Sequence, residues 1–122
     1  MDRDLVCIPR GPFVMGSKDD NELAWDDEKP QHTLETPYDY WIGKFPVSNA
    51  QFGEFMHSTS FETRAEREGW CWVWNAGEGR WEKKAGANWR RPLGINSSID
   101  ALGQHPVVQV CWHDARAFCE WL

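Results

Sequence analysis

The sequence predicts an irregular α+β fold with little regular secondary structure. Short candidate strands and short candidate helices follow one another, and residues 82–104 show no periodicity at all. Nine tryptophans are spread over 122 residues that hold few long aliphatic runs. Because tryptophan is highly buried on average, we expect most of these side chains to fill the core, although an aromatic-lined ligand groove remains an alternative.

The first forty-five residues read as strands around an acidic loop. Apolar residues at 5–8 and 13–17 flank Pro9-Arg10-Gly11-Pro12, which predicts a hairpin between them. Residues 18–31 are polar and acidic but lack the alternating acidic ligands and central glycine of an EF-hand, so we expect a solvated loop. Residues 32–34 and 38–44 are predicted to be extended.

Two capping boxes predict two helices. Ser48 and Gln51 are spaced as a box, Val47 and Phe52 as a hydrophobic staple, and the helix is expected over 49–57. Its apolar face combines Phe52 with Phe55 and Met56. The second box, Thr63 and Glu66, begins a short helix that Gly69 ends.

The second half is expected to hold two further strands and a last helix. Residues 70–74 are apolar throughout, which predicts a strand buried on both faces, and Trp81 begins the returning strand. Residues 107–110 are a further strand candidate. A helix from Trp112 would present an apolar face made of Ala115, Phe118, Cys119 and Leu122. That face is unfinished, so we expect residues 1–122 to be the N-terminal portion of a single domain, incomplete at its C-terminus.

Composition excludes several classes of protein. The formal net charge of −6 gives no electrostatic reason to expect nucleic acid as a partner, and no apolar run is long enough for a membrane span or a signal peptide. We therefore expect a cytoplasmic chain. Its four cysteines contain no CxxC pair, and we expect buried thiols rather than a zinc site.

Six segments, taken together and in order, resemble the formylglycine-generating enzyme (sulfatase-modifying factor) family. They span essentially the whole chain: Ile8-Pro9-Arg10-Gly11-Pro12-Phe13-Val14-Met15-Gly16-Ser17, Asp27-Glu28-Lys29-Pro30-Gln31-His32, Ile42-Gly43-Lys44-Phe45-Pro46-Val47-Ser48-Asn49-Ala50-Gln51-Phe52, Thr63-Arg64-Ala65-Glu66-Arg67-Glu68-Gly69-Trp70, Ala87-Asn88-Trp89-Arg90-Arg91-Pro92 and His105-Pro106-Val107-Val108-Gln109-Val110-Cys111-Trp112-His113-Asp114-Ala115.

The resemblance implies a C-type-lectin-like fold and an oxidase. Members of this family convert a cysteine of a target sulfatase to formylglycine with dioxygen and copper, so a protein or peptide such as a sulfatase is the implied partner. The copper-binding cysteines and the structural calcium sites belong to the later part of the domain. We therefore expect no copper or calcium site within this chain, and no catalytic residue, and we expect the chain alone to be inactive.

The chain departs from the family pattern at three positions. Cys111 stands where serine is usual and would cap the last helix less well, while Arg91 and Gln109 stand where histidine is common. Arg91 and Gln109 are compatible with a groove of altered specificity, but neutral drift explains them equally.

Four residues are candidates for a substrate groove: Asn88, Trp89, Arg90 and His105. A tryptophan beside a planar guanidinium can cradle an extended peptide. In the simpler interpretation Trp89 fills the core, Arg90 pairs with an acid and His105 has a structural hydrogen bond.

Two other functions remain open. One is a non-catalytic binding or sensor module, which would lack the later cysteine pair. The other is a sulfoxide synthase of the ergothioneine type, which would need a separate helical domain that supplies histidines. Fold alone does not choose among these functions.

Overall fold

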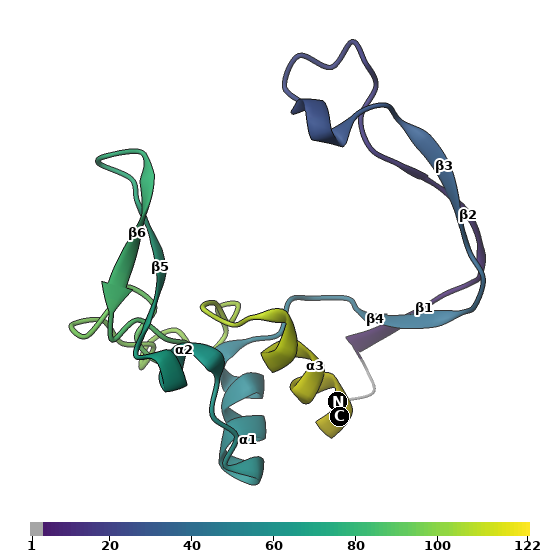
Figure 1. Ribbon diagram of the computed structural model, residues 1–122. Coiled ribbons are helices and arrows are strands. Elements are labelled where there is room, and N and C mark those ends of the chain that lie inside the picture. Colours follow the sequence, from purple (N-terminus) through teal and green to yellow (C-terminus); the bar gives the residue numbers. More distant parts are fainter. Residues whose placement is uncertain (1–3) are drawn as a thin grey trace. The chain divides into compact units, whose positions relative to one another are not determined.

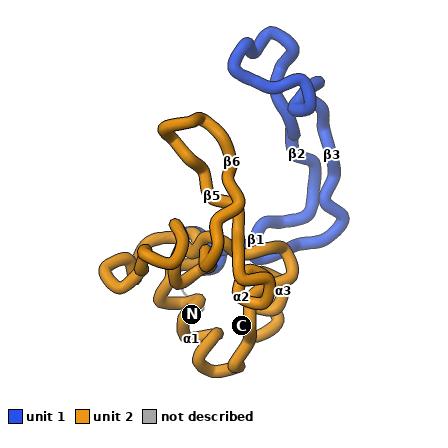
Figure 2. The backbone as a smooth tube through the Cα atoms, turned by 60° about the vertical axis from the view of Figure 1, so that its left-hand side comes forward, with its two compact units in different colours: residues 1–45 blue, residues 46–122 orange. Residues whose placement is uncertain are grey.

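The computed structural model describes residues 4–122, which divide into two compact units, one ending at Phe45 and one formed by Pro46–Leu122 (Figures 1 and 2). Three two-stranded sheets and three α-helices make up the regular structure of the described residues. The predicted irregular α+β class is therefore confirmed.

The first unit is built from two antiparallel strand pairs. Strand β1 (Leu5–Ile8) pairs with β4 (Tyr40–Gly43), and β2 (Gly11–Met15) pairs with β3 (His32–Thr36). The predicted hairpin between the first two strands is therefore wrong. The chain continues through Pro9 and Arg10 without reversing, because the Arg10 N–H donates to Asp39 Oδ1 at 2.8 Å, in the chain that returns beside it.

The acidic stretch between β2 and β3 is an exposed loop, as predicted. It contains a short 3₁₀ helix, η2 (Asp26–Glu28), and closes where the Ser17 N–H donates to the Glu28 carbonyl at 2.8 Å. Gly16 lies beside this closure with φ +85°, and a Cβ there would lie 2.6 Å from the Glu28 oxygen. Glycine is therefore required at this position.

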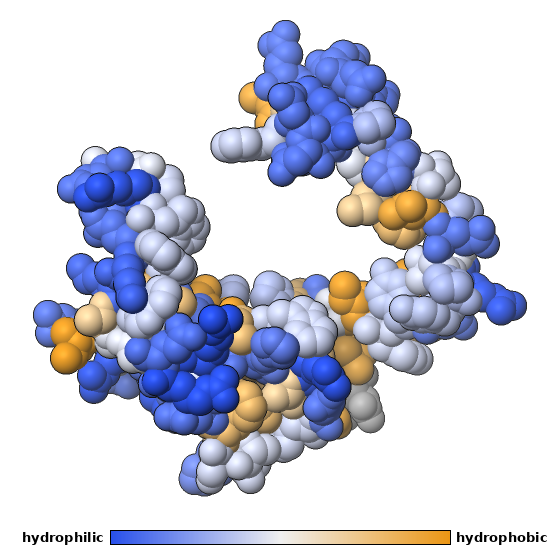
Figure 3. Space-filling model, in the orientation of Figure 1, coloured by the Kyte–Doolittle hydropathy of each residue, from blue (hydrophilic) through white to orange (hydrophobic). Residues whose placement is uncertain are grey.

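Large apolar side chains are exposed on the strands of this unit (Figure 3). Val14 and Trp41 are 64% and 65% exposed, and Phe13 is about half exposed. A two-stranded ribbon has two faces, and no second layer within the unit packs on either of them.

The second unit begins with α1 (Asn49–Thr59), whose capping box forms as predicted. The Gln51 N–H donates to Ser48 Oγ at 3.2 Å, and the Ser48 N–H donates to Gln51 Oε1 at 2.9 Å. The helix runs two residues beyond the predicted end, because the Thr59 hydroxyl donates to the Phe55 carbonyl and Ser60 then takes a left-handed conformation.

Helix α2 (Arg64–Glu68) also forms as predicted, with its capping box at Thr63 and a left-handed Gly69 at its end. Strands β5 (Trp70–Asn75) and β6 (Arg80–Ala85) follow as an antiparallel pair. Burial of β5 on both faces is wrong, since Trp72 is 52% exposed and Trp74 is 49% exposed. The hairpin has two strands only, so Trp74 packs edge-on against Trp81 and is not covered by a further layer.

The chain from Gly86 to Cys111 is irregular, and the predicted strand at 107–110 does not form. Only an isolated bridge joins Pro106 to Ser48, and the Val107 N–H donates to the Val47 carbonyl at 2.9 Å. Gln109 then has φ +60°, which is incompatible with a continuing strand.

Helix α3 (Trp112–Trp121) begins where predicted, but its inward face differs from the expected one. Ala115, Cys119 and Leu122 are exposed. The inward face carries Asp114, Ala117, Phe118 and Trp121 instead. Asp114 faces inward because its carboxylate accepts hydrogen bonds from the N–H groups of Arg64 and Cys111. A pattern of apolar residues does not predict an inward-facing carboxylate.

The core of the second unit is an aromatic cluster between α1 and α3, formed by Phe52, Phe55, Met56, Trp89 and Phe118. The expected burial of most tryptophans is wrong, because among the described residues only Trp89 is buried. The expected burial of the cysteines is also wrong: Cys7 and Cys119 are exposed, and Cys71 and Cys111 are half-buried. In residues 4–122 no helix has the length and apolar character needed to cross a bilayer.

Candidate functional site

Asn88 shapes a tight turn that sends neighbouring side chains in different directions. Its Oδ1 accepts from the backbone N–H groups of Arg90 at 2.9 Å and Arg91 at 3.0 Å. Backbone hydrogen bonds between Asn88 and Arg91 close the turn in both directions. Asparagine is favoured in turns because its side chain accepts hydrogen bonds from backbone N–H groups that follow it. Asn88 therefore stabilises the turn.

Trp89 points from this turn into the core. It is 4% exposed and packs edge-on against Phe52, with ring centroids 5.3 Å apart. Its indole Nε1 is buried without a hydrogen-bond partner. Trp89 therefore fills the core, as the simpler of the two interpretations expected. It also lines a surface hollow.

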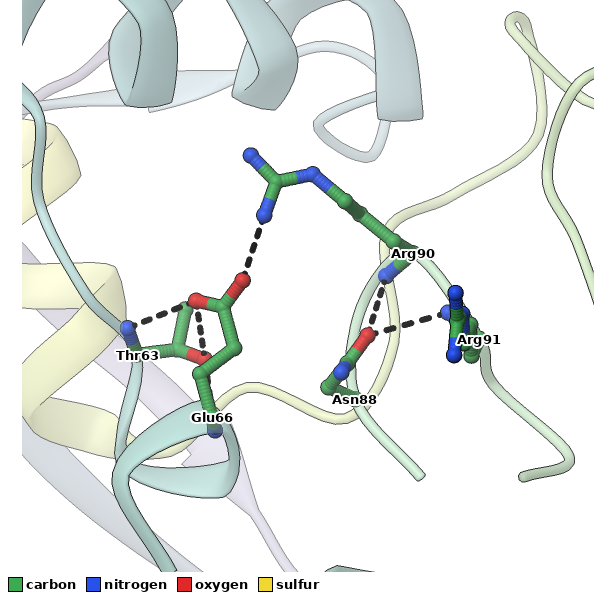
Figure 4. A network of polar contacts seen from close by, with 5 residues as sticks. All are labelled: Thr63, Glu66, Asn88, Arg90 and Arg91. Atoms are coloured by element: carbon green, nitrogen blue, oxygen red, sulfur yellow. Dashed lines mark hydrogen bonds and ion pairs between the residues drawn. The ribbon is translucent and has the colours of Figure 1, made fainter. Parts of the chain in front are cut away.

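Arg90 lies over the Trp89 ring, with Cζ 4.4 Å from the ring centroid. Its Nη1 donates to Glu66 Oε1 at 2.5 Å (Figure 4). The other carboxylate oxygen of Glu66 accepts from both the N–H and the hydroxyl of Thr63, each at 2.9 Å. Glu66 thus links the first turn of α2 to the 88–91 turn, and the Arg90 guanidinium is held in place above the indole.

A hollow of about 550 Å³ opens beside the 88–91 turn. The hollow is lined by two arginines, a tryptophan, two isoleucines, an aspartate and small polar residues: Trp89, Arg90, Arg91, Ile95, Asn96, Ser97, Ser98, Ile99 and Asp100. We name it the arginine hollow. The Arg91 side chain is exposed and forms no ion pair with another residue of 4–122.

His105 is not brought to this hollow. It is exposed, and its backbone N–H donates to the Leu102 carbonyl at 3.0 Å while its carbonyl accepts from the Asn49 N–H at 2.9 Å. These bonds attach the chain before Pro106 to the first turn of α1. Of the four predicted groove residues, Trp89 and Arg90 line the hollow, Asn88 shapes the adjoining turn without lining it, and His105 lies apart.

A second hollow, of about 240 Å³, lies between α2, the start of β5 and the start of α3. We name it the thiol hollow, because two of the four cysteines line it. Its lining residues are Arg64, Ala65, Glu68, Trp70, Cys71, Trp72, Gln109, Val110, Cys111 and Asp114. Sequence reasoning did not find this hollow, since its walls come from segments some forty residues apart.

Asp114 is the most buried charged group at the thiol hollow, with 1% exposure. Its Oδ1 accepts from the Arg64 N–H at 3.1 Å and its Oδ2 accepts from the Cys111 N–H at 2.8 Å. Both N–H groups lie at helix starts, where the helix dipoles favour a negative charge. The carboxylate therefore fixes α2 and α3 relative to each other beneath the hollow.

The two positions where histidine is common in the resembled family differ in role. The Gln109 side chain donates from Nε2 to the Pro92 carbonyl at 2.8 Å and so attaches the irregular segment to the approach to α3. Arg91 extends from the turn at the arginine hollow. Of the two departures, Arg91 lines the arginine hollow and Gln109 lines the thiol hollow.

Three or more histidine, cysteine, aspartate or glutamate side chains do not converge as metal ligands anywhere in residues 4–122. Copper and calcium stay expectations from the family resemblance.

Comparison with known proteins gives a consistent result. The family model for the sulfatase-modifying factor enzyme 1-like domain matches residues 1–122. The formylglycine-generating enzyme of Thermomonospora curvata is 35% identical over 98% of this chain and 44% of its own length. The solved structure of PvdO from Pseudomonas aeruginosa matches 96% of this chain and 38% of its own, with a TM-score of 0.56 and 22% identity, which supports the fold alone.

Two relatives with different names also match. A Bos taurus protein named inactive C-alpha-formylglycine-generating enzyme 2 is 35% identical over 97% of this chain and 43% of its own length. A hercynine oxygenase of Mycolicibacterium smegmatis is 28% identical over 95% of this chain and 27% of its own length. The chain therefore spans less than half the length of each of these relatives.

Proposed function

The chain belongs to the sulfatase-modifying factor enzyme 1-like family, and from that premise we propose that it forms the substrate-binding part of a formylglycine-generating oxidase. The proposed reaction converts a cysteine of a target sulfatase to formylglycine. The observation that supports a binding role is the arginine hollow, which is lined by three consecutive residues of the 88–91 turn. Copper, calcium and the oxidase chemistry itself are predictions from the family.

The arginine hollow suits an extended peptide in both shape and chemistry. Its walls combine the apolar side chains of Ile95 and Ile99 with polar groups, as small-molecule and peptide sites commonly do. The Arg91 guanidinium supplies donors for a peptide carbonyl or carboxylate, while Asp100 supplies an acceptor. The Asn88 turn and the Glu66–Arg90 pair hold one wall in place before the peptide arrives, which limits the ordering cost of binding.

The proposal is tested by binding of a fluorescent sulfatase peptide that contains the target cysteine. Arg91→Ala should weaken binding by about tenfold, which corresponds to roughly 1.4 kcal/mol. The matched control is Arg116→Ala, because Arg116 is an exposed arginine of α3 that pairs with Glu120 and does not line the hollow. Equal affinity for a scrambled peptide, or equal loss in both variants, would contradict a peptide site here.

A second function is favoured by one specific finding. A relative named as an inactive enzyme and a formylglycine-generating enzyme are both 35% identical to this chain. Sequence identity over residues 1–122 therefore does not distinguish a catalyst from a binding module. Formylglycine carries an aldehyde, so hydrazide labelling of the target sulfatase after co-expression separates the two. Because the copper-binding cysteines of the family belong to the later part of the domain, the co-expressed protein must contain that part. Labelling that depends on it supports the oxidase, whereas peptide binding without labelling supports the module.

A further inference from the structure

We propose that Cys71 and Cys111 form a dithiol site in the thiol hollow that reacts with small-molecule disulfides and closes to an internal disulfide. Cys71 is the second residue of β5, and Cys111 immediately precedes α3. Both line the same hollow of about 240 Å³, and both are half-buried. Small-molecule reagents can therefore reach a space that both cysteines line.

The surroundings of the two thiols set them apart from the other cysteines. Cys7 and Cys119 are exposed, and neither lines the arginine hollow or the thiol hollow. Cys111 has the Arg64 side chain as a neighbour in the hollow. The pKa of the Arg64 guanidinium is raised mainly by its hydrogen bond to Glu68.

The chemistry proceeds by thiol–disulfide exchange. The Cys111 thiolate attacks one sulfur of a small disulfide, so a mixed disulfide forms and one small thiolate leaves. The Cys71 thiolate then attacks the Cys111 sulfur, which forms the Cys71–Cys111 bond and expels the second small thiolate. Two protein thiols are oxidised, one small disulfide is reduced to two thiols, and the two protons released by the protein thiols neutralise the leaving thiolates.

The internal bond would join the start of β5 to the start of α3 across the hollow. It would occupy space that a ligand of the thiol hollow needs, and it would constrain the unfolded chain. The oxidised protein should therefore melt at a higher temperature than the reduced protein. This inference concerns the thiol hollow only and does not depend on the peptide site proposed at the arginine hollow.

The test uses the reduced protein incubated with oxidised glutathione in the absence of oxygen, followed by intact-mass measurement and peptide mapping. We expect a Cys71–Cys111 link in the native protein, with glutathione adducts on the exposed Cys7 and Cys119. In Cys71→Ser, Cys111 should keep its glutathione, because the resolving thiol is missing. In 6 M guanidinium the preference for the 71–111 link should disappear, which controls for simple thiol reactivity.

Two results would overturn the proposal. Native protein that carries separate glutathiones on Cys71 and Cys111 would show that the thiols do not meet. A 71–111 link that forms equally in the denatured protein would show that the hollow does not direct it. The Cys7→Ser/Cys119→Ser double variant removes competing thiols, and mapping of the unsubstituted protein gives an answer even if a variant fails to fold.

Discussion

Asp114 Oδ1 accepts a hydrogen bond from the Arg64 N–H at 3.1 Å, across fifty positions of sequence. The same carboxylate accepts from the Cys111 N–H through Oδ2 at 2.8 Å, and the side chain is 1% exposed. One buried carboxylate thus satisfies N–H groups at the starts of two helices, which would otherwise be left without partners. The packing of α2 against the start of α3 depends on it.

Asp114→Ala should lower the free energy of unfolding by roughly 2–4 kcal/mol, because two buried N–H groups lose their acceptor. Asp114→Asn should cost less, since its single carbonyl oxygen can still serve one of them. Urea denaturation followed by circular dichroism measures both changes. Asp100→Ala is the control, because Asp100 is exposed and its carboxylate accepts no hydrogen bond within the described residues. Equal stability of Asp114→Ala and the control would contradict this role.

Glu66 has two separable functions, in the capping box and in the pair with Arg90. Glu66→Gln keeps an oxygen for the Thr63 N–H but removes the charge, so we expect a loss below about 1 kcal/mol, since Arg90 is largely exposed. Glu66→Ala removes both functions and should cost about 1–2 kcal/mol. Hydrogen exchange of the first amides of α2 separates the two effects. Similar exchange in both variants would show that the charge, and not the cap, holds this helix end.

Sequence patterns predicted the helices whose ends are determined by residues close to them in sequence. The Ser48 and Thr63 capping boxes and the left-handed Gly69 each involve residues within one or two turns, and both helices formed as expected. The segments that form β1 to β6 were also predicted to be extended, but the strand predicted at 107–110 does not form, and the partner predicted for the first strand was wrong. The pairing of β1 with β4 depends on contacts such as Arg10 with Asp39, which are twenty-nine positions apart.

Burial was predicted less well than secondary structure. Apolar character suggested that Trp72 and Trp74 were covered, whereas coverage requires a second layer that sequence pattern does not reveal. The candidate site divides in the same way. Asn88, Trp89 and Arg90 were found because they are adjacent in sequence. The thiol hollow was missed because the segments that line it come together only in the folded chain.

Trp89 provides a test of the core that distinguishes size from polarity. Trp89→Ala should cost about 3–5 kcal/mol, because a large cavity opens beside Phe52 and the aromatic cluster. Trp89→Phe should cost clearly less, roughly 1–2 kcal/mol, because it retains a ring and removes an indole N–H that has no partner. The comparison is made by urea denaturation. Trp112→Ala is the control at a site 66% exposed and should change stability by about 0.5 kcal/mol or less.

Cys111→Ser should stabilise α3 by about 1 kcal/mol, because serine is among the best residues at the position before the first helical turn and cysteine is a poor one. The Asp114 carboxylate accepts from the N–H of residue 111, and the Cys111 side chain already lies at the Asp114 N–H, so the serine hydroxyl would replace a weak sulfur acceptor in the same capping box. Urea denaturation measures the gain, and Cys119→Ser, an exposed substitution on the same helix, should show none. A loss of stability in Cys111→Ser would mean that the apolar contacts of this thiol at the hollow outweigh the capping hydrogen bond.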